Sequence, residues 1–161
     1  MNGRLAMSVL LVFALIFGAA LWWFQTRAYY EKVDGLTEVS AYGDAFPVSN
    51  YTSIDAHTSP LKFRACFTVD WDYWPSDEYK DVATPLQGPG WFDCFDAEAI
   101  QADITAGAAT AILAGENETF GFDRYIAQYE DGRAFMWRQI NACGEAKFAG
   151  EKMPDGCPTE D

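Results

Sequence analysis

The residues best suited to chemistry lie in the stretch "GPGWFDCFDAEAI", residues 88–100, where Cys94 stands between Asp93 and Asp96. A thiol among carboxylates can serve as a nucleophile, a metal ligand or half of a disulfide. A nucleophilic cysteine needs a thiolate and a nearby base, and this stretch contains no histidine. The residue types therefore favour a disulfide over a reactive centre.

The other cysteines support the same interpretation. A zinc site would call for closely spaced ligands, but the chain has no Cys-x-x-Cys pair and only one histidine, His57. An even number of cysteines suits an oxidising compartment, and four cysteines permit three pairings. We expect Cys66–Cys94 and Cys143–Cys157, because the second pair closes a short loop around a Pro-Asp-Gly turn.

The flanking carboxylate of this stretch fits a helix start. Asp96 is a suitable N-cap, because its carboxylate can accept amide hydrogen bonds at the positive end of the helix dipole. Phe95 and Ile100 have the spacing of a hydrophobic staple, and Gly107 is a suitable end for the helix. Cys94 and Asp96 are therefore expected to hold a helix in place.

His57 offers a second arrangement to weigh. A triad with Asp55 and either Ser53 or Ser59 can be written down, but neighbours so close in sequence rarely reach triad geometry. An exposed loop histidine is favoured.

The stretch "VDWDYWPSDEYKD", residues 69–81, gathers acids and aromatic residues. It lacks the glycine and the terminal glutamate of an EF-hand loop, and Trp74 and Pro75 occupy ligand positions. A solvated or partner-facing acidic loop is favoured over calcium. No cofactor is predicted.

The elements that position these residues indicate an α+β domain. Strands are expected at residues 61–69, 110–115 and 146–150, around one packed helix. A hairpin is expected over residues 122–140, turning at Asp131-Gly132. The predicted cross-strand neighbours are Glu130–Arg133, Gln128–Phe135, Ile126–Trp137 and Tyr125–Arg138. The core face of the hairpin is expected to carry Phe122, Ile126, Phe135 and Trp137. The opposite face is expected to carry the charges of Asp123 and Arg138.

Charge excludes one class of partner. From Asp34 onward the chain has 23 acidic and 8 basic side chains, a net charge of −15, whereas residues 1–33 carry +2. Nucleic-acid binding is excluded, because phosphates would be repelled.

The N-terminal stretch "LAMSVLLVFALIFGAALWWF", residues 5–24, predicts a transmembrane helix. Twenty helical residues span about 30 Å, the thickness of one hydrocarbon core. The helix is expected to continue to about Asp34, before Gly35. Four aromatic residues are expected at the membrane interface and two small residues at a helix-packing face. The aromatic residues are Trp22, Trp23, Tyr29 and Tyr30, and the small residues are Ala14 and Gly18.

The alternative for this segment is a signal peptide cleaved after Ala20, where "GAA" offers small residues. The apolar run continues through "LWWF", which favours an uncleaved anchor. Basic residues on the two flanks nearly balance, so charge does not set the orientation. All four cysteines follow the helix, which predicts a cytoplasmic N-terminus and a domain outside the cytoplasm.

Four stretches of the chain together carry a family resemblance. They are "MNGRLAMSVLLVFALIFGAALWWFQTRAYYEKV", "IDAHTSPLKFRACF", "GPGWFDCFDAEAI" and "YEDGRAFMWRQINACGE". They resemble an uncharacterised alphaproteobacterial family of small single-pass membrane-anchored proteins. The resemblance implies an inner-membrane anchor with a periplasmic domain and carries no established activity.

These observations predict an anchor over residues 1–34 and an acidic extracytoplasmic domain over residues 35–161. We expect a non-catalytic accessory protein whose partners are the lipid bilayer and a larger membrane assembly. The alternative is a periplasmic enzyme, or a ligand- or metal-binding domain, that uses the acids around Asp70 to Glu78.

Overall fold

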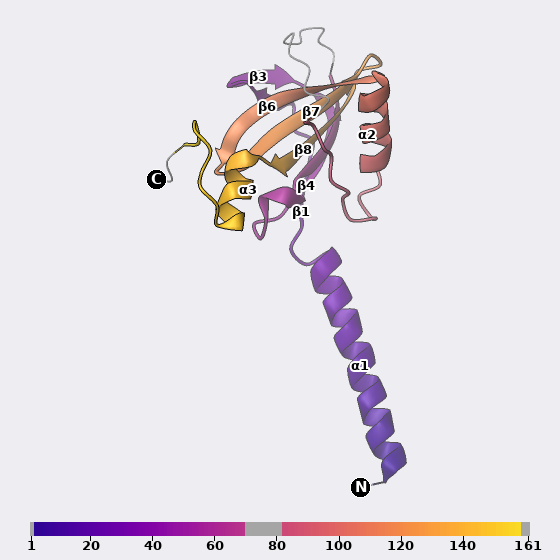
Figure 1. Cartoon of the computed structure of the whole chain (residues 1–161). Helices are drawn as coiled ribbons and strands as arrows, with labels where there is room; N and C mark the ends of the chain where they lie inside the picture. Colours follow the sequence, from indigo (N-terminus) through magenta and orange to yellow (C-terminus); the bar gives the residue numbers. More distant parts are fainter. Residues whose placement is uncertain (1, 70–81, 159–161) are drawn as a thin grey trace. The chain divides into compact units, whose positions relative to one another are not determined.

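The computed structural model describes residues 2–69 and 82–158. The chain divides into two compact units, Met1–Tyr30 and Glu31–Asp161 (Figure 1). The first unit is an apolar helix, and the second is an α+β domain with two disulfides. The predicted fold class is confirmed.

Helix α1 (Gly3–Thr26) contains an 18-residue window with a mean hydropathy of 2.5, and none of its residues is buried. Its length and composition are sufficient for it to cross a membrane. The predicted extension to Asp34 is wrong, because Glu31–Asp34 form strand β1, which pairs with β4 (Ser49–Asp55). Asp34 Oδ1 also accepts a hydrogen bond from the Thr52 hydroxyl at 2.5 Å, which ties β1 to the sheet.

The main sheet has six antiparallel strands in the order β1-β4-β5-β8-β7-β6. A separate hairpin is formed by β2 and β3, and a 3-10 turn, η1, precedes β5. The remaining bounds are β2 (Glu38–Ala41), β3 (Asp44–Pro47), η1 (Pro60–Lys62), β5 (Arg64–Thr68), α2 (Ala97–Ala106), β6 (Ala109–Thr119), β7 (Phe122–Tyr129), β8 (Arg133–Ile140) and α3 (Ala142–Ala149).

Both faces of the sheet bury side chains. The face that carries Met136 shares a core with the β2–β3 hairpin, including the buried Val39 and Ala41. The opposite face carries Trp137, which is fully buried and lies 6.4 Å from the Phe95 ring just before α2. In the view of Figure 1, α2 lies at the right of the domain and α3 at its lower left.

Helix α2 begins and ends as the sequence predicts. The Asp96 carboxylate accepts hydrogen bonds from the amides of Glu98 and Ala99, both at 3.1 Å. Gly107 ends the helix in the left-handed conformation at φ +75°, which glycine adopts without strain. In the last turn of α2, the Asp103 carboxylate accepts a hydrogen bond from the Tyr129 hydroxyl at 2.7 Å, which joins α2 to β7.

The β7–β8 hairpin forms where predicted, but its register differs by one residue. Tyr125 lies opposite Trp137 and Ile126 opposite Met136, so the predicted neighbours are wrong. The turn is wider than a two-residue Asp-Gly loop, because β7 ends at Tyr129 and β8 begins at Arg133. Within the turn, the Gly132 amide donates to the Tyr129 carbonyl at 3.0 Å. A one-residue slip exchanges the two faces of a strand.

This slip also separates the expected charge pair. Arg138 binds Asp55 at 3.0 Å, and its guanidinium lies 4.5 Å from the centre of the Phe63 ring. Asp123 lies on the opposite face of β7, with Tyr125.

The predicted strand at residues 146–150 is instead the second half of helix α3. Asn141 caps this helix, since its side-chain oxygen accepts a hydrogen bond from the Gly144 amide at 3.0 Å. Gly150 ends it at φ +69°. Within its described residues the domain therefore has two short α-helices, α2 and α3, rather than the one expected.

Candidate functional site

The segment that leads into α2, residues 82–96, crosses the Trp137 face of the sheet without pairing as a strand. The Gln139 side chain forms with this segment the hydrogen bonds that a neighbouring strand would form. Its Oε1 accepts a hydrogen bond from the Thr84 amide at 2.7 Å, and its Nε2 donates to the Val82 carbonyl at 2.7 Å. The Trp137 indole donates to the same Oε1 at 3.2 Å, which fixes the amide orientation.

A buried arginine holds the same segment further along. Arg64 is 2% exposed, and its guanidinium donates to the backbone carbonyl of Leu86 through Nε. Its Nη1 donates to the carbonyls of Leu61 at 2.7 Å and Phe63 at 2.5 Å. The guanidinium also lies 5.5 Å from the centre of the Phe95 ring. Arg64 therefore links the backbone of residues 61–63 to that of the segment at Leu86.

The predicted disulfide Cys66–Cys94 is confirmed and closes the far end of this segment, with a Cα–Cα distance of 6.4 Å. Cys94 is thus a bridge between β5 and the start of α2 and is unavailable as a nucleophile. Asp96 is engaged as the helix cap. Cys94 and Asp96, the residues first considered for chemistry, therefore both hold the segment in place.

A groove of 760 Å³ lies between residues 82–86, the sheet and the N-terminus of α3. Most of its exposed lining is apolar, and two carboxylates, Asp123 and Glu145, face it. Among the described residues, no lysine or arginine lines it. The lining residues are Leu61, Val82, Thr84, Leu86, Leu113, Asp123, Tyr125, Gln139, Ile140, Asn141, Ala142, Cys143 and Glu145.

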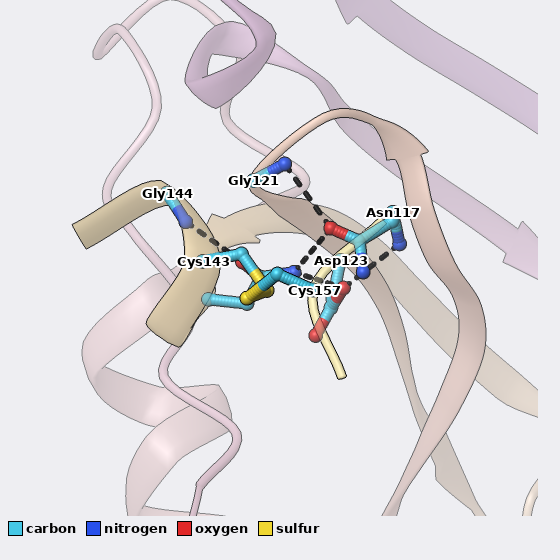
Figure 2. Close-up of a disulfide and its surroundings, with 7 residues drawn as sticks. Asn117, Gly121, Asp123, Cys143, Gly144 and Cys157 are labelled. Atoms are coloured by element: carbon cyan, nitrogen blue, oxygen red, sulfur yellow. Dashed lines mark hydrogen bonds between the residues drawn. A yellow bond between two sulfur atoms is a disulfide. The ribbon is translucent and has the colours of Figure 1, made fainter. Parts of the chain in front are cut away.

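The acidic end of the groove is built by a hydrogen-bond network of Asn117, Asp123 and Asn141. Figure 2 labels Asn117 and Asp123 of this network. Asp123 Oδ1 accepts hydrogen bonds from the Asn117 amide at 3.0 Å and from Asn141 Nδ2 at 2.7 Å. Asn141 Nδ2 also donates to Asn117 Oδ1 at 2.9 Å, and that oxygen accepts from the Gly121 amide at 3.1 Å. These hydrogen bonds together fix the positions of Asp123, Asn117 and Asn141.

Two glycines and a disulfide pack α3 against this network. A side chain on Gly144 would overlap the carbonyl oxygen of Gly121, so the turn between β6 and β7 and the first turn of α3 meet only because both residues are glycine. The predicted disulfide Cys143–Cys157 is confirmed, with a Cα–Cα distance of 5.7 Å (Figure 2). It ties the C-terminal tail to the same turn of α3.

Asp123 differs in its burial from the other carboxylates among the described residues. It is 8% exposed, whereas Asp93, Asp96 and Glu145 are exposed. Its Oδ1 is fully engaged, but within residues 2–69 and 82–158 no hydrogen bond or ion pair reaches its Oδ2. The residue lines the groove, so a bound group can approach that oxygen.

A second groove, of 840 Å³, lies on the other side of the same segment, against α2. It shares Thr84 and Leu86 with the first groove and is also mostly apolar, with Glu98 at its edge. No buried polar side chain lines it, among the described residues. We therefore take the groove beside α3 as the candidate site.

The comparisons with known proteins give a family and no function. A model of a family of unknown function (DUF6446) matches residues 35–158. The chain belongs to this family. No curated protein and no solved structure matches it.

The family domain includes all four cysteines, the groove and the network around Asp123. Helix α1 lies before the matched residues. The match confirms the expectation of an uncharacterised family.

His57 does not form a triad in the structure. Its side chain is 89% exposed, and its Nε2 lies 3.2 Å from Glu31 Oε1. Asp55 is bound to Arg138 at 3.0 Å, and Ser59 accepts a hydrogen bond from the Leu61 amide at the start of η1. Ser53 is buried and donates to the Val33 carbonyl. The structure thus engages the triad candidates in separate contacts.

The acids from Asp70 to Glu78, on which the alternative function depends, lie outside the described residues. In the part of the chain that the structure describes, no group of three or more His, Cys, Asp or Glu side chains is arranged to hold a metal.

The predicted interface residues fall at the end of α1 and just beyond it. Trp22 and Trp23 lie in the last turn and are 58% and 53% exposed within their unit. Tyr29 and Tyr30 follow the helix end, so they lie outside the helix that was expected to continue to about Asp34. Ala14 and Gly18 lie one turn apart on α1, and nothing within the unit packs against Gly18. Their roles at a membrane remain predictions.

The sequence analysis missed the three residues that shape the groove: Asp123, Gln139 and Asn141. Asn141 carried a usable signal, because asparagine is a preferred N-cap and a helical stretch follows it. Asp123 carried no such sequence signal, because its orientation depends on the register of the hairpin. Gln139 carried none either, because its partners lie in a segment more than fifty residues away in the chain.

Proposed function

We propose that this chain is a non-catalytic, membrane-anchored accessory protein of the inner membrane, whose acidic domain lies in the periplasm and docks onto a larger membrane assembly. The observation that carries the proposal is the open apolar groove with a buried acid, on a family domain that follows an apolar helix of membrane-spanning length. Apolar grooves with a few fixed polar groups are typical of binding sites.

The state of the other reactive groups supports a binding role. Both thiols of each pair are joined, the Arg64 guanidinium is engaged by backbone carbonyls, and Asp96 caps a helix. These groups give rigidity to the walls of the groove, and a rigid surface binds a partner with little loss of conformational entropy.

The proposed location rests on two properties of the sequence. Disulfides form and persist outside the cytoplasm, and both disulfides lie on the C-terminal side of α1. The resemblance to alphaproteobacterial membrane-anchored proteins points to the same arrangement.

The interaction is tested by gentle detergent extraction of native membranes that contain the tagged full-length chain, followed by native electrophoresis. We expect the chain to migrate in a discrete complex larger than its own 18.0 kDa, with a companion in constant proportion. A chain recovered only as the free protein would overturn the proposal.

The anchor and topology need a separate measurement. We expect the mature chain to keep residues 1–20, to resist carbonate washing, and to lose its domain when protease is added to spheroplasts. A soluble product that begins at Leu21 would show that the segment is a signal peptide, and protection from the protease would place the domain in the cytoplasm.

A further inference from the structure

The lining of the groove beside α3 defines the chemistry of what can bind there. Its walls are formed largely by aliphatic and aromatic side chains, among them Leu113, Tyr125 and Ile140. Its charged groups are the carboxylates of Asp123 and Glu145, and no basic residue among those described faces them. A complementary group therefore has an apolar body and a positive charge.

The position of Asp123 makes one of these carboxylates a specific recognition group. Its Oδ1 is held by two hydrogen bonds from within the network, so the carboxylate cannot rotate freely. Its Oδ2 is left without a partner among the described residues, although the side chain is 8% exposed. A cationic donor can reach that oxygen from the groove and would form a strong, charge-assisted hydrogen bond with it.

The charge of the whole domain favours a protein as the source of that cation. The net charge of −15 is spread over the chain from Asp34 onward and creates a field that extends beyond the groove. Such a field speeds the approach of a basic surface more than that of a single amine, because each positive charge of the partner contributes. Glu145, exposed at the groove edge, adds a second contact for such a surface.

We propose that the groove receives a lysine or arginine side chain from a basic segment of the partner protein, with its alkyl stem along Leu113, Tyr125 and Ile140 and its charged head on Asp123 Oδ2. Long basic side chains bury their methylene groups on apolar surface while the head remains with a polar partner. This inference rests on the proposed docking function and names the chemistry of its partner.

The test uses the full ¹⁵N-labelled chain in phosphatidylcholine nanodiscs, with three probes added in turn. These are the peptides acetyl-Leu-Lys-Leu-amide and acetyl-Leu-Gln-Leu-amide, and butylammonium alone. We expect the lysine peptide to shift the amide signals of Leu113, Asp123 and Ile140, with an affinity at least about tenfold above that of the glutamine peptide and of butylammonium.

Charge variants test whether the lysine peptide binds in the groove. Asp123→Asn keeps an oxygen that can accept the hydrogen bonds of Asn117 and Asn141, so the network can persist while the charge is lost. It should weaken the lysine peptide about tenfold or more. Asp44→Asn, the same change at an exposed site on the β2–β3 hairpin, should leave binding unchanged.

A second pair of variants keeps the test decisive if Asp123→Asn does not fold. Glu145→Lys places a positive charge at the groove edge and should abolish binding of the lysine peptide, whereas Glu151→Lys, an exposed site past the end of α3, should have little effect. Equal binding of the lysine and glutamine peptides, or no shift at the groove, would overturn the inference. Butylammonium binding as tight as the lysine peptide would show that the site takes a free amine.

The native complex separates this inference from the proposed function. If Asp123→Asn and Glu145→Lys remain fully associated in membranes, the groove is not the docking site, although the accessory role stands. If the wild-type chain is free in membranes, the accessory role fails, whatever the peptides show.

Discussion

Gln139 holds Thr84 as an adjacent β-strand would, through a side-chain oxygen that accepts the Thr84 amide at 2.7 Å. Its amide nitrogen completes the pair by donating to the Val82 carbonyl at the same distance. One side chain thereby fixes the wall that the two grooves share, and both grooves depend on it for their shape.

Gln139→Ala is expected to lower the free energy of unfolding by about 1–3 kcal/mol, because the Thr84 amide and the Val82 carbonyl lose their partner. Chemical denaturation measures this loss. Amide exchange at Thr84 should accelerate strongly, while exchange in the β7–β8 ladder should change little.

Gln128→Ala is the matched control on the neighbouring strand. The Gln128 side-chain oxygen is buried and has no hydrogen-bond partner. Its removal should therefore change stability by no more than about 0.5 kcal/mol. Equal losses for the two variants would mean that the Gln139 hydrogen bonds do not hold the segment.

The sequence predicted those features that depend on local chemistry. Asp96 and Gly107 bound α2 because a capping carboxylate and a left-handed glycine act on their own few neighbours. The cysteine pairing followed from loop length and from an adjacent turn, and both bridges are present.

Features that depend on register or on distant packing were not predictable in the same way. Asp131-Gly132 marks the hairpin, but a turn wider by one residue exchanged the faces and placed Asp123 toward the groove. In α3, the apolar pattern of residues 146–150 was too short to distinguish helix from strand, and the Asn141 cap decided the outcome. The groove itself required the segment at residues 82–86 to meet β8, a non-local contact.

The two disulfides should be quantitative and should contribute separately to stability. Denatured protein from native membranes should show no alkylatable thiol before reduction and four afterwards. Two or more reactive thiols before reduction would contradict both the bridges and the oxidising compartment.

Paired alanine variants measure the contribution of each bridge. The bonds join residues 28 and 14 positions apart in the sequence. Loop-closure entropy predicts losses of about 3.5 kcal/mol for Cys66/Cys94→Ala and about 3 kcal/mol for Cys143/Cys157→Ala. Denaturation under non-reducing conditions checks both values. A loss below about 1 kcal/mol for either pair would contradict the assignment of that bridge as a structural staple.

Asp96→Ala should lower the free energy of unfolding by about 1 kcal/mol, through loss of the N-cap of α2. Asp93→Ala is the control on the other side of Cys94, since the Asp93 side chain is exposed and makes no hydrogen bond or ion pair with the described residues. Thermal melting distinguishes the two variants. Loss of partner association by Asp96→Ala at unchanged melting temperature would show that the carboxylate has a binding role.

Tyr129 should make the domain sensitive to alkali. Burial, together with the hydrogen bond to Asp103, raises the pKa of the Tyr129 phenol well above its usual value of 10.0. Because the unfolded chain ionises this phenol first, stability is constant below about pH 10 and falls as the pH rises further toward the folded-state pKa. Tyr129→Phe should cost about 1 kcal/mol at neutral pH through the lost hydrogen bond and should reduce the decline above pH 10. Tyr42→Phe, at an exposed site, should leave the decline intact. Denaturation at a series of pH values measures both slopes, and identical slopes for wild type and Tyr129→Phe would falsify the assignment of alkaline sensitivity to this residue.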